Sequence, residues 1–324
     1  MPQFEVRTDL AVEEKESFPG DGGEISGVAL REWHPASGHM KLTEVRILNE
    51  RGAKSMGKAE GTYLTLEAGQ LTQPDEDYHR EVSEELGKQI RLLVKNLEQQ
   101  GKLEVNVKHS VLAVGLGNAS VTPDALGPSV LGNLRVTRHL MRQDQTGGDT
   151  KEAITVLSGI VPGVMAQTGM ETAEILKGVI HEISPDLLIV IDALAARSVR
   201  RLGTTIQLTD TGIHPGSGVG NHRHSLTIES LGIPVLAIGV PTVVGAAAIV
   251  HDTVSTLIGT LTAHMETKGM GNFLEQMGSD EQYRLICELL EPEFGSLYVT
   301  PPDIDQTIKQ LSFTISEGIH QAFL

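Results

Sequence analysis

The stretch VLAVGLGNASVTPD, residues 111–124, decides the fold: an apolar run leads into a glycine-rich loop that ends on Asp124. The stretch LLIVID, residues 187–192, repeats the pattern and ends on Asp192. Short apolar runs bounded by turn residues are typical of strands that are buried on both faces, as in a parallel sheet. The carboxyl ends of parallel strands open onto one edge, where ligands bind. We therefore expect Asp124 and Asp192 to meet at that edge.

Strand and helix patterns alternate along most of the remaining chain. Residues 41–67 read as a pair of strands with a turn from Gly52 to Gly61, and a helix is expected over 75–100. This order predicts an α/β fold: a mostly parallel, twisted sheet with helices on both faces, plus a small β-containing insertion near the N-terminus. The expected strands are 111–115, 154–157, 187–191, 204–208 and 234–238, and the expected helices are 125–140, 170–183, 244–262, 281–290 and 303–321.

The composition limits the class of protein. The chain has 324 residues, a formal net charge of −16 and 40% apolar residues. The acidic charge argues against a nucleic acid partner, and the single cysteine, Cys287, excludes an intramolecular disulfide. The sequence has neither a signal-peptide pattern nor an apolar run of membrane-helix length, so we expect a cytoplasmic protein with no membrane partner. Residues 1–30 are polar and acidic, and we expect them to form a flexible arm.

Asp124 and Asp192 each allow a structural and a catalytic interpretation. Asp124 stands where a helix should begin, and Asp192 precedes the helix-like run 193–197, so each could be a helix cap. As a pair they could do chemistry, because two carboxyl groups in one site do not both ionise easily. One keeps its proton while the other acts as a base. Such a pair can activate water against a peptide carbonyl group without a metal ion or a cofactor.

Glycine-rich loops at the same sheet edge are expected to line a cleft. The loop at 115–118 lacks both the third glycine of a dinucleotide loop and the Lys-Ser/Thr ending of a phosphate loop. The loop at 211–224 holds three histidines, but their loose spacing predicts no metal site. No Gly-x-Ser-x-Gly elbow of a serine hydrolase occurs. The expected cleft-lining residues are Gly115, Gly117, Asn118, Gly216, Gly218 and, in a turn after the last strand, Pro241.

Long runs of this sequence resemble the germination protease family, the endopeptidases that degrade small acid-soluble spore proteins. The resemblance covers nearly the whole chain. The runs that carry it are VRTDLAVE (6–13), VGLGN (114–118), VTPDALGP (121–128), IDALAAR (191–197), DTGIHPGSGVGN (210–221), GIPV (232–235) and VPTVV (240–244).

The resemblance implies a fold similar to the hydrogenase maturation proteases, a homotetramer, and work in the forespore and spore core. It implies an aspartic-type peptidase whose two functional aspartates match Asp124 and Asp192. It also implies a zymogen that cleaves itself between Asp9 and Leu10, which divides the chain into a propeptide, 1–9, and a single peptidase domain, 10–324. The local pattern of acidic Asp9, apolar Leu10, small Ala11 and acidic Glu13 is similar to the family's cut sites.

Two other functions compete with this one. A metal-dependent endopeptidase of the hydrogenase maturation type would use a bound nickel centre, but no histidine matches the required place beside the first loop. A binding module without enzymatic activity would use both aspartates as helix caps. Insensitivity to a chelator would exclude the first, and cleavage of a spore protein would exclude the second.

Overall fold

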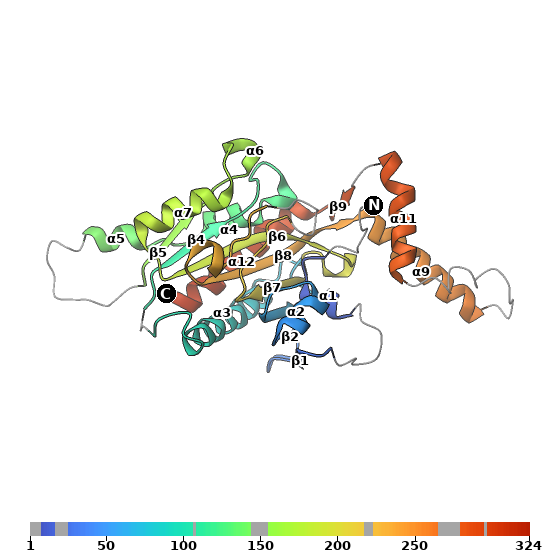
Figure 1. Cartoon of the computed structure of the whole chain (residues 1–324), viewed down its shortest axis with the longest axis horizontal. Helices are drawn as coiled ribbons and strands as arrows, with labels where there is room; N and C mark the ends of the chain where they lie inside the picture. Colours follow the sequence, from blue (N-terminus) through green and yellow to red (C-terminus); the bar gives the residue numbers. More distant parts are fainter. Residues whose placement is uncertain are drawn as a thin grey trace.

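The computed structural model describes residues 8–16, 25–105, 108–143, 155–216, 223–264, 279–294 and 297–324. Within these residues the strands form one sheet in the order β1-β2-β3-β7-β8-β6-β4-β5, and β9 pairs with β8 (Figure 1). The strands are β1 (Val28–Trp33), β2 (Lys41–Ile47), β3 (Gly61–Glu67), β4 (Val111–Gly115), β5 (Leu157–Ile160), β6 (Leu187–Ala196), β7 (Thr205–Thr209), β8 (Val235–Gly245) and β9 (Tyr298–Val299).

The predicted α/β class is confirmed, and the sheet divides into two halves. Strands β8, β6, β4 and β5 are parallel, whereas β7, β3, β2 and β1 add on in antiparallel order. The parallel part is therefore smaller than the sequence predicted, because the strand expected at 204–208 runs the other way. Residues 197–204 between β6 and β7 are too few for the crossover of roughly a dozen residues that a parallel strand needs.

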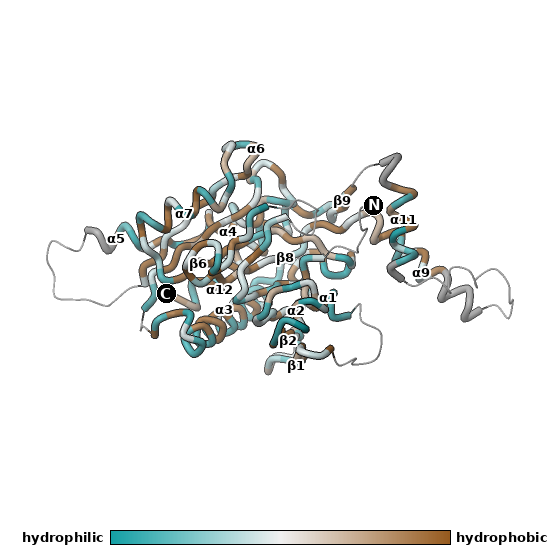
Figure 2. The backbone as a smooth tube through the Cα atoms, viewed as in Figure 1, coloured by the Kyte–Doolittle hydropathy of each residue, from teal (hydrophilic) through white to brown (hydrophobic). Residues whose placement is uncertain are grey.

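Helices cover both faces of the sheet, as predicted. Helices α3 (Glu76–Gln99), α4 (Leu126–Asn133) and α12 (Ile304–Phe323) pack on one face, and α7 (Thr172–Ile183) and α8 (Ile228–Leu231) pack on the other. Alternate residues of each central strand point to opposite faces, so both faces are apolar and these strands carry mostly the brown of apolar residues in Figure 2.

The remaining helices surround this centre. Helices α9 and α11 pack against each other at one end of the molecule, away from the centre of the sheet (Figure 1). The predicted helix at 125–140 is two helices, α4 and α5, and the predicted turn at 52–61 holds the short helix α2. None of the helices in the described ranges is long and apolar enough to cross a membrane. The remaining bounds are α1 (Ala11–Glu16), α2 (Glu50–Met56), α5 (Arg138–Gln143), α6 (Met165–Thr168), α9 (Ala246–His264), α11 (Ser279–Phe294), and two 3-10 turns, η1 (Thr122–Asp124) and η3 (Val199–Arg201).

The described part of the N-terminal segment, residues 8–16, is core and not the flexible arm that the sequence predicted. Leu10 and Ala11 are fully buried and Val12 is 4% exposed. Leu10 and Val12 pack with Leu194 and other apolar residues of β6, β8 and α9. The apolar run Leu10–Val12 is too short to show a periodicity, so the acidic residues around it dominated the prediction.

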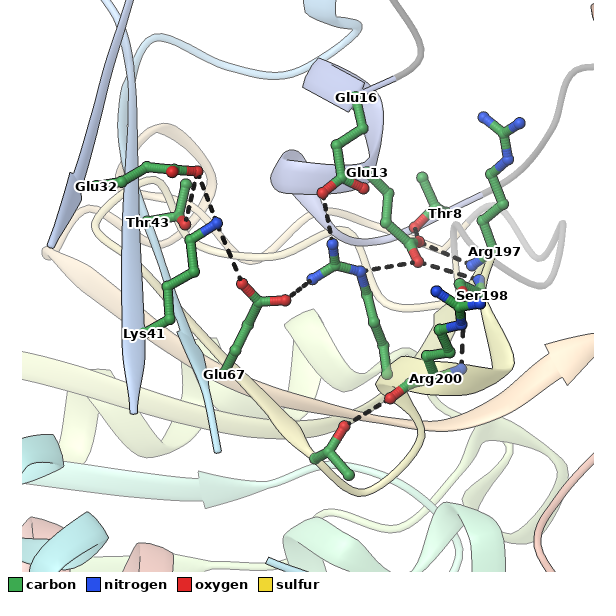
Figure 3. A network of polar contacts seen from close by, with 12 residues as sticks. Thr8, Glu13, Glu16, Glu32, Lys41, Thr43, Glu67, Arg197, Ser198 and Arg200 are labelled. Carbon is green, nitrogen blue, oxygen red and sulfur yellow. Dashed lines mark hydrogen bonds and ion pairs between the residues drawn. The ribbon is translucent and has the colours of Figure 1, made fainter. Parts of the chain in front are cut away.

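Arg201 fastens this segment to the body of the protein. Its guanidinium group contacts Glu13 at 3.4 Å, Glu16 at 2.6 Å and Glu67 at 2.8 Å. The buried carboxylate of Glu13 also accepts hydrogen bonds from the backbone N–H groups of Arg197 and Ser198 and from the Thr8 hydroxyl. Figure 3 shows how these side chains converge between α1 and η3. The network ties residues 8–16 to the loop that follows β6.

We predict that Arg201→Met destabilises the fold by about 3 kcal/mol at pH 7, because it leaves the buried Glu13 carboxylate without its cationic partner. Urea unfolding measures this loss. Arg80→Met is the matched control: the Arg80–Asp77 pair is exposed on α3 and should contribute under about 1 kcal/mol. Equal stability of the two variants would show that Arg201 does not anchor the segment.

Candidate functional site

The loop after β4 is folded tightly enough to hold Asp124 over the edge of the sheet. Gly117 has a φ of +106°, and a Cβ atom there would lie 2.0 Å from the Asp124 carbonyl oxygen. A Cβ at Gly127 would lie 2.3 Å from the carbonyl oxygen of Leu116. Both positions therefore require glycine. The Asn118 backbone N–H donates to Oδ2 of Asp124 at 2.7 Å, which fixes the carboxyl group beside the loop.

Asp192 lies inside a strand and is not a helix cap. Strand β6 continues through Asp192 to Ala196, and helix α4 begins after Ala125, so Asp124 is not the N-cap of α4 either. Strand β4 ends opposite Ile191, where the Leu116 N–H donates to the Ile191 carbonyl at 2.8 Å. Asp192 is therefore the first residue of β6 beyond the end of β4. Both helix-cap interpretations fail.

The carboxyl groups of the buried Asp192 and the half-buried Asp124 interact electrostatically. Asp192 is 7% exposed, and this burial raises the pKa of its carboxyl group well above the ordinary value. The negative charges of Asp124 and then Asp9 raise this pKa further, while the Ala193 N–H and Arg223 lower it. Burial also raises the pKa of Asp124, against the Asn118 N–H and the charge of Arg223. At least one carboxyl of such a pair keeps its proton at a pH where free aspartate is ionised.

The N-terminal segment lies along the edge of β6 that β4 leaves open. The Asp9 N–H donates to the Ala195 carbonyl at 3.0 Å, and the Ala195 N–H donates to Oδ2 of Asp9 at 2.9 Å. The Asp9 carbonyl oxygen accepts two further hydrogen bonds, from Lys58 Nζ and from Gln207 Nε2, both at 3.1 Å. The bond between Asp9 and Leu10 is thus held beside the strand that carries Asp192.

Asp192 and Gln207 stand on the same face of the sheet. In the register of the sheet, Asp192 pairs with Gly239 of β8, and Gly239 pairs with Gln207 of β7. Paired residues of neighbouring strands point to the same face, and two strand spacings place their Cα atoms roughly 10 Å apart. A Cβ at Gly239 would lie 2.4 Å from Leu194 Cδ1, so the glycine lets Leu194 lean over the sheet beneath Leu10.

The structure places the expected cleft-lining residues in different kinds of element. Gly115 ends β4, Gly117 and Asn118 follow it in the loop at the carboxyl edge, and Gly216 occupies a turn with φ +75°. Gly218 lies outside the described residues. Pro241 is not in a turn: β8 runs on to Gly245, and the Pro241 carbonyl accepts the N–H of Gly203, in the turn before β7, at 2.9 Å. In the described ranges, no group of three or more His, Cys, Asp or Glu side chains is placed to hold a metal ion.

Sequence reasoning missed Lys58, Gln207 and Arg223. Gln207 left a usable signal, because it interrupts the apolar strand TIQLT and is nevertheless 7% exposed. A polar residue at a buried strand position needs a hydrogen-bonding partner. Lys58 and Arg223 lie in loops, where charged residues are common, and nothing in the local sequence distinguishes them.

We predict that Asp192→Asn is more stable than the wild type at pH 7 and equally stable below pH 3.8. The raised pKa means that folded Asp192 binds a proton that the unfolded chain has released, so wild-type stability falls as the pH rises from the ordinary value of 3.8 towards the folded pKa. The neutral amide lacks this penalty. Urea unfolding between pH 3 and pH 8 measures it, with exposed Asp77→Asn as control; a variant that loses stability at pH 7 would contradict the prediction.

The comparisons with known proteins agree on one family. The sequence model of the germination proteases matches residues 5–273. The chain is 47% identical to the germination protease of Caldanaerobacter subterraneus subsp. tengcongensis, over 98% of this chain and 94% of that protein. It is 44% identical to that of Clostridium tetani (98% and 95%) and 39% identical to that of Bacillus subtilis strain 168 (99% and 94%).

Among solved structures, the chain is similar to a [NiFe] hydrogenase maturation protease, HycI from Thermococcus kodakarensis KOD1. The TM-score is 0.26 and the identity is 21%, over 42% of this chain and 76% of that chain. The assignment depends on the curated relatives, whose similarity covers 98% or more of this chain and so includes both Asp124 and Asp192. The chain belongs to the germination protease family and is therefore an endopeptidase of spore germination.

Proposed function

We propose that Asp124 and Asp192 are the catalytic pair of an aspartic-type endopeptidase that needs no metal ion or other cofactor. The observation that carries this proposal is the placement of a buried Asp192 beside Asp124 at the carboxyl edge of the parallel strands. Neither carboxyl group caps a helix, and two interacting acids whose pKa values are both raised by burial are suited to acid–base work.

The two environments support a division of roles between the carboxyl groups. Asp192 is the more buried acid and carries the stronger upward pKa shift, so it holds the proton. Asp124 accepts the Asn118 N–H and is favoured as an anion by Arg223, so it acts as the base. Asp124 removes a proton from water as the water oxygen attacks the peptide carbonyl carbon. The C–N bond then breaks, and the leaving amine takes a proton from the carboxylic acid.

The first substrate of this site is the protein's own N-terminal segment. We propose self-cleavage between Asp9 and Leu10, which removes residues 1–9 as a propeptide and leaves 10–324 as the peptidase. Asp9 bonds to Ala195 at the open edge of β6 through both its backbone N–H and its side-chain carboxylate, which holds the segment against the strand. This contact brings the charge of Asp9 close enough to raise the pKa of Asp192.

The same contacts favour small acid-soluble spore proteins as the later substrates. Leu10 is enclosed by apolar residues, Ala11 is fully buried, and Glu13 accepts two backbone N–H bonds and contacts Arg201. These contacts suit an acidic, apolar, small and acidic pattern. We propose that a homotetramer of this chain carries out the reaction in the spore core.

We predict that Asp124→Asn and Asp192→Asn each lower the rate of cleavage of a purified small acid-soluble spore protein by at least about 100-fold, because each removes one partner of the acid–base pair. Gel electrophoresis and mass spectrometry of the fragments measure the rate. Asp77→Asn, on the exposed side of α3, should cleave at the wild-type rate.

The same assay separates the rival functions. A chelator should leave the wild-type rate unchanged; loss of cleavage with chelator and its return with nickel would favour the metal-dependent alternative. If the wild type and both Asn variants all fold and none cleaves, the chain is a binding module and the proposal fails.

A further inference from the structure

The carbonyl group of Asp9 has an unusual environment for a backbone oxygen next to a strand. It accepts hydrogen bonds from two side chains, Lys58 Nζ and Gln207 Nε2, each at 3.1 Å. The two donors come from different parts of the sheet, since Lys58 precedes β3 and Gln207 lies in β7. Two donors that converge on one carbonyl oxygen are the arrangement that stabilises negative charge on that oxygen during acyl transfer.

Gln207 fixes the position of the Asp9–Leu10 bond from both sides. Its Nε2 donates to the Asp9 carbonyl, and its Oε1 accepts the Ala11 N–H at 2.7 Å. The Ala11 N–H can only donate, so the side-chain amide has one orientation, with its NH₂ group towards Asp9. Because Gln207 is 7% exposed and packed within the sheet, it holds this geometry without rearrangement.

Lys58 brings positive charge to the same oxygen. It follows Gly57, whose left-handed conformation ends α2 and turns the chain towards the site. Burial lowers the pKa of Lys58, whereas the carboxylates of Asp9, Glu14 and Glu13 raise it, and the charge of Lys58 in turn lowers the pKa of His214. The ammonium group is therefore surrounded by acidic groups of the N-terminal segment while it donates to the carbonyl.

We propose that Lys58 and Gln207 are the oxyanion donors for self-cleavage at the Asp9–Leu10 bond, an inference that rests on the proposed function. Water adds to the Asp9 carbonyl carbon as Asp124 takes its proton, and the carbonyl oxygen becomes an oxyanion held by Lys58 Nζ and Gln207 Nε2. The oxyanion re-forms the C=O bond as the C–N bond breaks. The products are the α-carboxyl group of Asp9 and the α-amine of Leu10, which takes its proton from Asp192.

In this proposal the oxyanion donors and the aspartates act on different atoms of the same peptide bond. Gln207 and Asp192 point to the same sheet face from strands on either side of β8, with Cα atoms roughly 10 Å apart. Leu194 leans over Gly239 between them, and Leu10 of the N-terminal segment packs against Leu194. The donors hold the oxygen, and the aspartates handle the protons of water and amine.

The test is a time course of self-cleavage in full-length protein, followed by intact mass after transfer to mildly acidic buffer. Lys58→Met and Gln207→Met should each slow the loss of residues 1–9 by about 10²- to 10³-fold, the usual cost of one oxyanion donor. Lys54→Met, exposed on the same helix α2 that leads to Lys58, should cleave at the wild-type rate.

A second readout separates catalysis from docking. Hydrogen exchange of the amides of residues 12–16 should show the same protection in both Met variants as in the wild type; Ala11 is left out because Gln207 itself accepts its N–H. Wild-type cleavage rates in both variants would overturn the inference. Slow cleavage together with lost protection would also overturn it, because Lys58 and Gln207 would then only hold the N-terminal segment in place. Asp124→Asn in the same series tests the proposed function independently: if it cleaves like the wild type, the aspartate mechanism fails whatever the Met variants do.

Discussion

The difference in length between β4 and β6 is the constraint on which the site depends. The two strands pair in parallel up to Gly115 and Ile191, and β6 then continues to Ala196 with β8 on one side and the Asp9 backbone on the other. Backbone groups along an open strand edge need partners, and a chain segment can supply them. The open edge thus does two things at once: it exposes Asp192 to the loop that carries Asp124, and it binds residues 8–10 next to both.

Burying acidic groups at this edge is unfavourable, and the surrounding structure compensates. Burial disfavours the charged forms of Asp192, Asp124 and Glu13. For Glu13 the cost is offset by backbone N–H donors and Arg201, which makes this acid an anchor. Asp192 accepts the Ala193 N–H and is favoured as an anion by Arg223, but burial and the charges of Asp124 and Asp9 outweigh both, so its protonated form is favoured. Glu13 and Asp192 are both buried, and they differ in the groups that contact them.

Much of the parallel half of the sheet could be predicted from the sequence, because a strand that is buried on both faces is a short, continuous run of apolar residues. The runs 111–115 and 187–191, and the aspartates that follow them, identified the edge correctly. The extension of β6 could not be predicted, since Ala193–Ala196 favours helix when read locally and becomes strand only through pairing with β8. The common partner of Lys58 and Gln207 could not be predicted for a related reason: both side chains contact the Asp9 carbonyl, which is about 50 residues from Lys58 and about 200 from Gln207 in sequence.

The central claim is that the segment bound to β6 is cut by the molecule that carries it. The most direct test is the first-order rate constant for loss of residues 1–9, measured by intact mass over a hundredfold dilution of the full-length protein. A docked segment reacts within its own chain, so we expect the rate constant to stay the same at every concentration. A rate constant that falls in proportion to dilution would show that one molecule cleaves another, and would contradict the account.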